Sequence, residues 1–245
     1  MLKTLSRTLF AFSLVLAVTT GARAGDNDIN LAATMAQNEF EDFVKELGTA
    51  IAYNPLGPAE PLGVIGFDLG VSVSLVDIDT TLWNEALQDT SAPSSFPIAR
   101  IQARKGLPFS IDVGGSLIQV PGSDVKVIGF EVRKALLDGT AATPALSVQG
   151  HYSALSGVDV LDLTTYGVGV GVSKGFLIFT PYAGIDQIWL DGSENDPDVA
   201  FTDVEDSIVR THVGVKMSLL PVLNIVAQAD FSEATVYSLR LNLGL

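Results

Sequence analysis

Apolar and polar residues alternate with a period of two along most of this chain. The pattern begins after Gly63, where every second position is apolar: Phe67, Leu69, Val71, Val73 and Leu75. It continues to the end of the chain, since apolar residues again hold every second position from Tyr237 to Leu245. Successive side chains of a β-strand point to opposite faces, so the pattern predicts strands with one apolar face.

Nine further segments of this kind follow the first one. Most hold about ten residues or slightly more, which is the length that a tilted transmembrane β-strand needs. Segment 125–137 is irregular, which predicts a β-bulge. The sequence therefore predicts ten strands, and the later nine are 97–105, 109–120, 125–137, 145–155, 161–173, 177–190, 207–219, 223–231 and 235–245.

The connections between these segments differ in length. Two are long, 77–96 and 191–206, and both follow odd-numbered strands. The connections after the even-numbered strands are all short to modest in length: 105–108, 138–144, 172–176 and 220–222. Outer-membrane barrels have long loops outside the cell and short turns in the periplasm. We therefore expect an all-β fold, an antiparallel transmembrane β-barrel of about ten strands over residues 62–245.

A helical period marks the region that precedes the barrel. Apolar residues recur there at helical spacing, with acidic residues between them: Leu31, Met35, Phe40, Phe43, Val44, Leu47 and Ile51. This predicts one amphipathic helix over 29–52, ended by the Pro- and Gly-containing stretch 54–58. We expect region 25–61 to plug the barrel or to cap it from the periplasm. A helix that covers the periplasmic mouth or lies at the membrane surface is the alternative to a plug inside the lumen.

Residues 1–24 have the pattern of a secretory signal peptide. Lys3 and Arg7 precede the apolar run 9–18, and Ala22-Arg23-Ala24 forms a small-residue cleavage site. The apolar run is too short to cross a bilayer as a helix, which needs about 20 residues. We therefore expect the chain to be exported and residues 1–24 to be removed.

Composition narrows the class of protein. The chain is 47% hydrophobic, yet the part after residue 24 has no unbroken apolar run of the length of a transmembrane helix. Loss of the three basic residues in 1–24 changes the net charge from −14 to −17. So acidic a chain lacks the basic surface that nucleic acids require. The absence of cysteine excludes stabilisation by disulfides, so burial or the membrane must stabilise the fold.

The second face of the predicted strands is polar and charged, and we expect it to line the barrel lumen. A secreted β-sandwich would have to bury these groups in its core, at a cost of several kcal/mol for each unpaired group. In the barrel, Asp68 should lie near Arg240. Arg100 or Arg104 should reach Asp112. The candidate lumen residues are Asp68, Arg100, Arg104, Asp112, Glu131, Arg133, His151, Asp186, Arg210, His212, Asp230 and Arg240.

These lumen charges have two interpretations. They can pair and fill the lumen as structural groups, or they can form a constriction that selects solutes. Inward glycines would leave room for a narrow path or for a plug: Gly114, Gly167, Gly169, Gly171 and Gly214. The width of the lumen distinguishes the two interpretations.

Two histidines offer the only enzymatic hypothesis. His151 and His212 should face inward in the outer half of the barrel, with Asp186 and Asp230 at similar height. A His–Asp pair near the rim could activate water, as in ten-stranded outer-membrane proteases of the omptin kind. A lumen histidine is more often a hydrogen-bonding residue, so we expect no enzyme and no cofactor. The acidic loop 191–206 does not have EF-hand spacing, so we expect a solvated loop and no metal site there. Calcium or magnesium that bridges the loop to lipopolysaccharide phosphates is the alternative.

The chain resembles bacterial outer-membrane β-barrel proteins in its signal peptide, in residues 63–245 and in its apolar last strand. That resemblance implies insertion by the barrel assembly machinery, with outer-membrane lipid and lipopolysaccharide as neighbours of a monomer. Leu245 departs from the aromatic residue that usually ends such proteins. Residues 50–60 also resemble the Asn-Pro-Ala turn of the long-chain fatty acid transporter family, through Asn54 and Pro55, with Leu56 in place of Ala. This local resemblance implies a plugged barrel for hydrophobic solutes.

The sequence therefore predicts an outer-membrane β-barrel that serves as a channel, a transporter or a binding barrel for small compounds, with apolar compounds favoured. The alternative is a structural or surface-interaction barrel with a closed lumen. A hydrolase at the rim is the third hypothesis.

Overall fold

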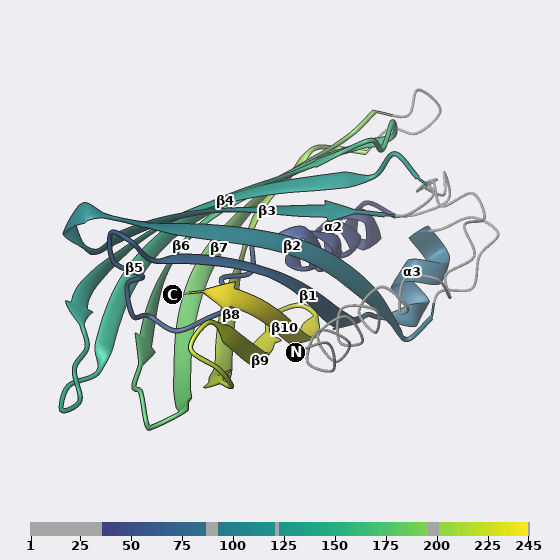
Figure 1. Cartoon of the computed structure of the whole chain (residues 1–245). Coiled ribbons are helices and arrows are strands. Elements are labelled where there is room, and N and C mark those ends of the chain that lie inside the picture. Colours follow the sequence, from purple (N-terminus) through teal and green to yellow (C-terminus); the bar gives the residue numbers. More distant parts are fainter. Residues whose placement is uncertain (1–35, 87–92, 121–122, 196–200, 245) are drawn as a thin grey trace.

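The computed structural model describes residues 36–86, 93–120, 123–195 and 201–244. The predicted signal peptide lies outside these residues, as does the first part of the predicted helix. Ten antiparallel strands form a closed barrel (Figure 1). They are β1 Phe67–Asp77, β2 Ser95–Leu107, β3 Ile111–Gln119, β4 Lys126–Asp138, β5 Ala145–Ser156, β6 Leu161–Ser173, β7 Phe179–Glu194, β8 Val204–Ser218, β9 Leu223–Phe231 and β10 Thr235–Gly244.

Each strand pairs with its neighbours in the sequence, and β1 pairs with β10 to close the barrel. The predicted fold class and strand number are confirmed. The register of β4 against β5 shifts between Ala135 and Leu137, so the β-bulge expected in 125–137 is present. Strands β7 and β8 extend further than predicted, which shortens the connection between them to 195–203.

The outer face of the barrel is apolar. Large apolar side chains that alternate with buried ones lie exposed on this face: Leu69, Ile101, Phe130, Val168, Val213 and Leu239 are examples. Tyr166 and Trp189 stack on neighbouring strands with ring centroids 5.5 Å apart. A closed barrel satisfies every backbone hydrogen bond within the wall, and an apolar outer face suits lipid. The alternation read from the sequence thus has its physical cause in the lipid around the barrel.

The two ends of the barrel differ. At one end, called here the loop end, lie the connections 78–94 and 195–203, and the first of these contains the short helix α3, Thr80–Ala86. At the other end, called the turn end, lie four short turns and the start of β1 and end of β10. Since long loops face outward in barrels of this kind, we expect the loop end at the cell exterior and the turn end in the periplasm.

The N-terminal helix α2, Gln37–Ile51, ends immediately before Asn54 and Pro55. At its start the backbone N–H of Ala36 donates a hydrogen bond to the Glu39 carboxylate, at 2.7 Å. A Glu at the third position of a helix satisfies an otherwise free N–H in this way. Among the described residues, neither helix is long and apolar enough to cross a membrane.

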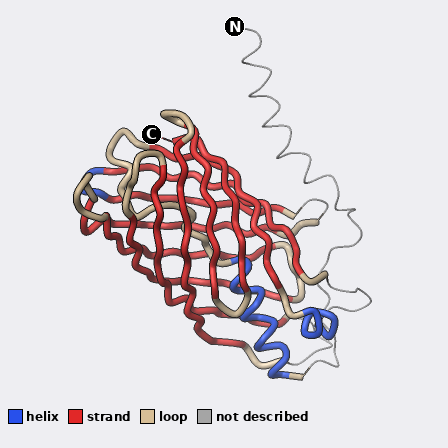
Figure 2. Tube along the Cα trace, turned by 90° about the horizontal axis from the view of Figure 1, so that it is seen from below, coloured by secondary structure: helices blue, strands red, loops and turns tan. Residues whose placement is uncertain are grey.

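Helix α2 lies at the loop end of the barrel, beside α3 (Figures 1 and 2). Its apolar face packs against inward side chains from the loop-end halves of the strands: Ile118, Val127, Leu155, Leu161 and Leu163. The helix therefore packs inside the barrel at the loop end, as in the plug alternative, and not at the turn end, where a periplasmic cap would lie. The reason is that the lumen wall is polar only over part of its height, and its loop-end part offers the apolar partner that the helix needs.

This placement predicts which residues can be reached from outside the cell. Ala36 at the start of α2 and Thr143 in the β4–β5 turn are both exposed, at opposite ends of the barrel. The chain has no cysteine, so single substitutions report cleanly. A polyethylene-glycol maleimide too large for porins should label Ala36→Cys on intact cells. It should label Thr143→Cys only after the outer membrane is opened, and the reverse pattern would contradict the placement of the helix.

Candidate functional site: the lumen and the turn-end cavity

The candidate functional site is the barrel lumen. The twelve charged and histidine side chains named from the sequence are all buried, with exposed fractions between 0% for Asp186 and 9% for Arg104. They alternate with exposed apolar residues on their strands and therefore belong to the inward face. Whether they form a selective constriction stays a prediction.

A linker, residues 52–62, connects α2 to β1 and passes down the lumen from the loop end to the turn end (Figure 1). Lumen side chains hold its backbone by donating hydrogen bonds to its carbonyl oxygens. The donor–acceptor pairs are Arg100–Ala52 at 3.0 Å, Gln102–Asn54 at 2.8 Å, Arg240–Leu56 at 3.0 Å and Arg133–Pro58 at 2.6 Å. The linker is therefore part of the lumen structure along its length.

The sequence of the linker explains this mode of attachment. Pro55, Pro58 and Pro61 have no backbone N–H and favour extended backbone. Such a segment presents more acceptors than donors, so arginine and glutamine side chains are its natural partners. Two of its remaining N–H groups also find partners on the wall: Ala59 donates to the Ser173 hydroxyl at 3.1 Å, and Leu62 to the Asp112 carboxylate at 3.1 Å.

Asn54 is the most connected side chain of the linker. Its amide nitrogen donates to Asp230 at 3.0 Å, and its amide oxygen accepts from Gln228 at 2.7 Å. Gln228 also donates to Asp230, at 2.7 Å. The three buried side chains thus form one hydrogen-bonded group between the linker and β9. These hydrogen bonds replace the ones that the same polar groups would make to water in the unfolded chain.

Asp186 is the centre of the charged network of the wall. Its carboxylate accepts from Gln149 at 2.8 Å and from the guanidinium of Arg210 at 3.2 Å. Nε2 of His151 lies 3.6 Å from one carboxylate oxygen, and Nδ1 of His212 lies 3.3 Å from the other. These five residues come from β5, β7 and β8. A buried charge is tolerated only when it is paired and hydrogen-bonded in this manner.

The inward glycines provide space for these side chains. A methyl group added to Gly169 would collide with the Asp186 carboxylate on the neighbouring strand, and one added to Gly114 would lie 2.9 Å from the Tyr53 hydroxyl. The sequence predicted room for a narrow path or for a plug. Beside Gly114 the space holds Tyr53, a side chain of the segment inside the barrel, and beside Gly169 it holds a side chain of the wall.

Other predicted pairs are found in part. Asp68 pairs with Arg240 across the β1–β10 seam, as predicted. Arg100 and Arg104 make no ion pair with Asp112 among the described residues; Arg104 lies 3.8 Å from Glu131. The prediction for Asp112 is wrong because register places an inward glycine of β3 opposite Arg104 and leaves Asp112 free to accept from the linker.

Glu131 also forms an ion pair with a second arginine, Arg133, with 2.9 Å between Nε and Oε1. Two guanidinium groups therefore share one buried carboxylate. The excess positive charge of this part of the lumen faces the carbonyl oxygens of the linker.

The rim His–Asp pair of the enzymatic hypothesis has a different geometry from the expected one. Both histidines face the same carboxylate, that of Asp186, while Asp230 is bound by Asn54 and Gln228. His151 is 6% exposed and His212 is 3% exposed. In this arrangement the two histidines hold the buried Asp186 carboxylate in position. The absence of enzymatic activity stays a prediction.

A polar contact joins α2 to α3 at the loop end. The Glu46 carboxylate accepts from the Trp83 indole N–H at 2.6 Å and from the backbone N–H of Asp79 at 3.2 Å. Burial raises the pKa of Glu46 above its usual range, although both hydrogen bonds oppose the rise. Phe43 packs on Trp83 with ring centroids 5.0 Å apart, so this corner combines the helix, the loop and an aromatic pair.

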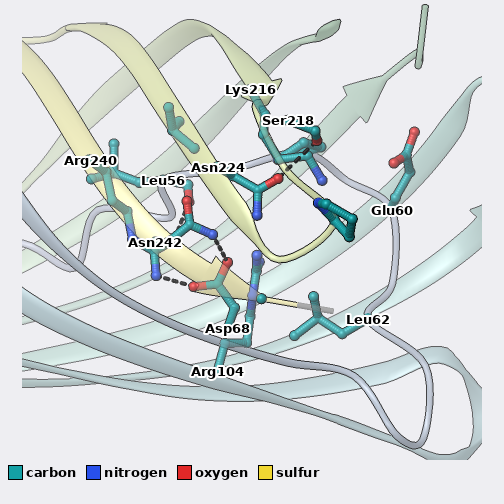
Figure 3. A pocket seen from close by; sticks show the side chains of 15 residues that line it. Leu56, Glu60, Leu62, Asp68, Arg104, Lys216, Ser218, Asn224, Arg240 and Asn242 are labelled. Atoms are coloured by element: carbon teal, nitrogen blue, oxygen red, sulfur yellow. Dashed lines mark hydrogen bonds and ion pairs between the residues drawn. The ribbon is translucent and has the colours of Figure 1, made fainter. Parts of the chain in front are cut away.

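A cavity of about 160 Å³ opens at the turn end. It lies between the linker and strands β1, β2, β8, β9 and β10 (Figure 3). Its polar and charged lining residues are Glu60, Asp68, Arg104, Lys216, Ser218, Asn224, Arg240 and Asn242. Two further lumen spaces, one beside Tyr53 and one beside His212, are much smaller, at about 10 Å³ each.

The list of site residues from the sequence left out uncharged groups that complete this network. Gln102 and Gln149 lie inward, as strand parity predicted, whereas Gln228 was not predicted. Gln102 and Gln228 bond to Asn54 of the linker, and Gln149 bonds to Asp186. Tyr53 stacks on His151 with ring centroids 6.3 Å apart and was read only as part of the helix end. Two features of the sequence could have indicated such partners. Strand parity places the glutamines on the inward face, and the closely spaced prolines of the linker show that its carbonyl oxygens need hydrogen-bond donors.

Comparisons with known proteins agree in fold alone. No protein-family model and no curated protein sequence matches the chain. Among solved structures, the KdgM porin has 9% identity and a TM-score of 0.40, covering 72% of this chain and 98% of its own. The translocator domain of the autotransporter NalP from Neisseria meningitidis has 9% identity and a TM-score of 0.39, covering 87% and 99%.

Neisserial surface protein A has 9% identity and a TM-score of 0.32, covering 74% of this chain and 96% of its own. The resemblance around Asn54 and Pro55 to long-chain fatty acid transporters is not shown by these comparisons and stays a prediction. The closed wall and its apolar outer face are those of a transmembrane β-barrel, the fold of bacterial outer-membrane proteins.

Proposed function

We propose that the protein is a gated outer-membrane barrel for small compounds, with residues 36–62 as the gate. The observation that carries the proposal is that one continuous segment outside the wall, α2 and its linker, fills the lumen from the loop end to the turn end. No strand has to break for this segment to move, because β1 begins after it.

The chemistry of the wall supports a path with two parts. The loop-end part is lined by apolar side chains that α2 now covers. The rest is lined by arginines, carboxylates and glutamines, several of which bond to linker carbonyls. A displaced segment would leave an apolar vestibule above a polar passage. Apolar small compounds would bind in the first, and the second would discriminate by charge.

The alternative is a barrel that stays closed and acts through its loops. It is favoured by the same dense network, since the lumen spaces beside Tyr53 and beside His212 are of only about 10 Å³ each. The two functions differ in one property, whether the segment can leave the lumen under working conditions.

A reversible staple tests this difference. The Cβ of Ala59 on the linker lies 3.9 Å from where a Cβ at Gly171 of β6 would be, close to the separation of about 3.8 Å in disulfides. In planar bilayers the oxidised Ala59→Cys/Gly171→Cys protein should show no openings, and reductant should restore them. The two single-cysteine variants are matched controls and should conduct with or without oxidant.

Removal of residues 25–54 should give a larger and steadier conductance. Silence of the parent, the reduced pair and the truncated protein alike would refute the gate and favour the closed barrel. A heat-modifiable gel shift before each measurement establishes that the barrel is folded.

A further inference from the structure

Helix α2 is held at the loop end by the two long connections as well as by the wall. The β1–β2 connection contains α3, and the described end of the β7–β8 connection, 201–203, reaches the start of α2. We propose that these two connections form a clamp that keeps α2 in the lumen, and that displacement of either connection releases the helix. The inference rests on the proposed function, because the clamp would regulate the gate.

The first contact of the clamp joins the β7–β8 connection to the first turn of α2. The side-chain amide of Gln37 donates to the carbonyl of Thr202 at 3.1 Å and accepts from the N–H of the same residue at 2.9 Å. Beside it the rings of Phe40 and Phe201 are stacked, with centroids 4.5 Å apart. A doubly bonded amide and a stacked ring fix the orientation of the helix, whereas apolar burial against the wall is not directional.

The second contact joins the β1–β2 connection to the middle of α2. The buried carboxylate of Glu46 accepts from the indole of Trp83 in α3 and from the backbone N–H of Asp79. Both donors belong to the connection, and among the described residues the carboxylate has no donor from the wall. A buried carboxylate is tolerated only while it is hydrogen-bonded. If α3 moves away, the seated position of α2 therefore becomes unfavourable.

The two contacts grip the helix from opposite sides. Gln37 and Glu46 are separated by about two and a half turns of an α-helix, so their side chains leave opposite faces. The two connections also come from opposite walls, because β2 lies across the closed ring of strands from β7. Neither α3 nor segment 201–203 takes part in the pairing of the strands, so both can move without a break in the wall.

The clamp makes the gate sensitive to events at the loop end. Anything that binds a displaced connection more tightly than the seated one shifts the equilibrium toward the released helix. The helix then keeps its contacts with the wall and with the other connection. Loss of one contact should therefore raise the released population by about tenfold and leave the barrel folded.

Substitutions on the connections, and not on the helix, test the clamp. The reporter is Ala50→Cys on the buried side of α2, labelled by a membrane-impermeant maleimide in the folded mature protein in detergent. Trp83→Phe removes the indole donor and keeps a ring, and Phe201→Ala removes the stacked ring. Each should speed labelling by about tenfold. Asp203→Ala is the matched control, because Asp203 is exposed beside Thr202 and has no hydrogen bond or ion pair with α2 among the described residues; it should be labelled at the rate of the parent.

A Glu46→Leu background separates the clamp from damage to the packing of α3. Without the carboxylate no donor is needed, so Trp83→Phe should no longer change the rate of labelling. Rates in Trp83→Phe and Phe201→Ala within about twofold of Asp203→Ala would overturn the proposal. An equal effect of Trp83→Phe with and without Glu46 would also overturn it. Every variant must first show the gel shift of the parent.

Conductance separates this result from that of the gate. Faster labelling in the two variants without conductance in any form of the protein would support the clamp and refute the gate. Conductance that the staple closes, with both variants labelled like the control, would support the gate and refute the clamp.

Discussion

Replacement of Asp186 by alanine should lower the free energy of unfolding by about 3–5 kcal/mol, the range for removal of one partner from a buried ion pair. The reason is what remains behind. Arg210 loses its carboxylate, and Gln149 loses its acceptor. His151 and His212 would face a cavity with no negative charge. Asp186 is fully buried, so water cannot replace the lost partners without a rearrangement of the wall.

Urea titration followed by the heat-modifiable gel shift measures this effect. Asp191→Ala is the matched control, because Asp191 lies on the same strand, is exposed, and has the same charge. Its effect should stay within about 0.5 kcal/mol, as for other surface substitutions. A loss of less than about 1 kcal/mol in Asp186→Ala would mean that the network does not stabilise the barrel.

The second large effect concerns the apolar packing of α2 against the wall. Phe43→Asp should release α2 from the loop end, because Phe43 is fully buried among apolar residues of the wall and against Trp83. Loss of a buried Phe costs about 3–5 kcal/mol, and a charge in the same place adds to that. Since about 1.4 kcal/mol is tenfold, the released population should rise at least a hundredfold.

A cysteine reports the release. Ala50→Cys, on the buried side of α2, should react with a membrane-impermeant maleimide about a hundredfold faster in the Phe43→Asp background than in the parent. In the Phe43→Leu background the rate should stay within about tenfold of the parent, because the apolar contact is kept. The barrel should keep its gel shift in both. An unchanged rate in Phe43→Asp would show that polar contacts of the linker alone hold the segment.

Strand number, register parity and the sides of the loops could be predicted from sequence because each depends on local alternation. A strand between lipid and lumen has one face toward each of them. The alternation alone therefore shows that Val168 faces the lipid and Gly169 the lumen, with no need to know their distant partners. The pair Asp68–Arg240 was also predictable, since closure of a ten-strand barrel requires the first and last strands to meet.

The position of α2 was not predictable in the same manner. Its apolar face indicated an apolar partner, but the lumen was treated as uniformly polar. Ile118, Val127 and Leu163 share inward parity with the lumen charges and lie toward the loop end. To predict that these residues lie at the same height, one must know the shear of the barrel, the stagger between neighbouring strands. The alternation within a single strand gives no information on that stagger.

The partners of Arg100 and Arg133 were missed for a related reason. Charge pairing was sought among side chains, whereas both arginines donate to backbone carbonyls of the linker. A linker in the lumen had to be assumed before those acceptors could be considered. In the sequence, only the prolines of the linker indicated that its carbonyl oxygens need side-chain donors, and those prolines were interpreted as the end of the helix.

Arg240 has a consequence for how the barrel is made. One guanidinium of the last strand binds Asp68 of the first strand and the carbonyl of Leu56. The seam that closes the cylinder is thus joined by the same group that grips the segment inside. A change at Arg240 would therefore act on two things together, the closure of the wall between its first and last strands and the attachment of the segment inside.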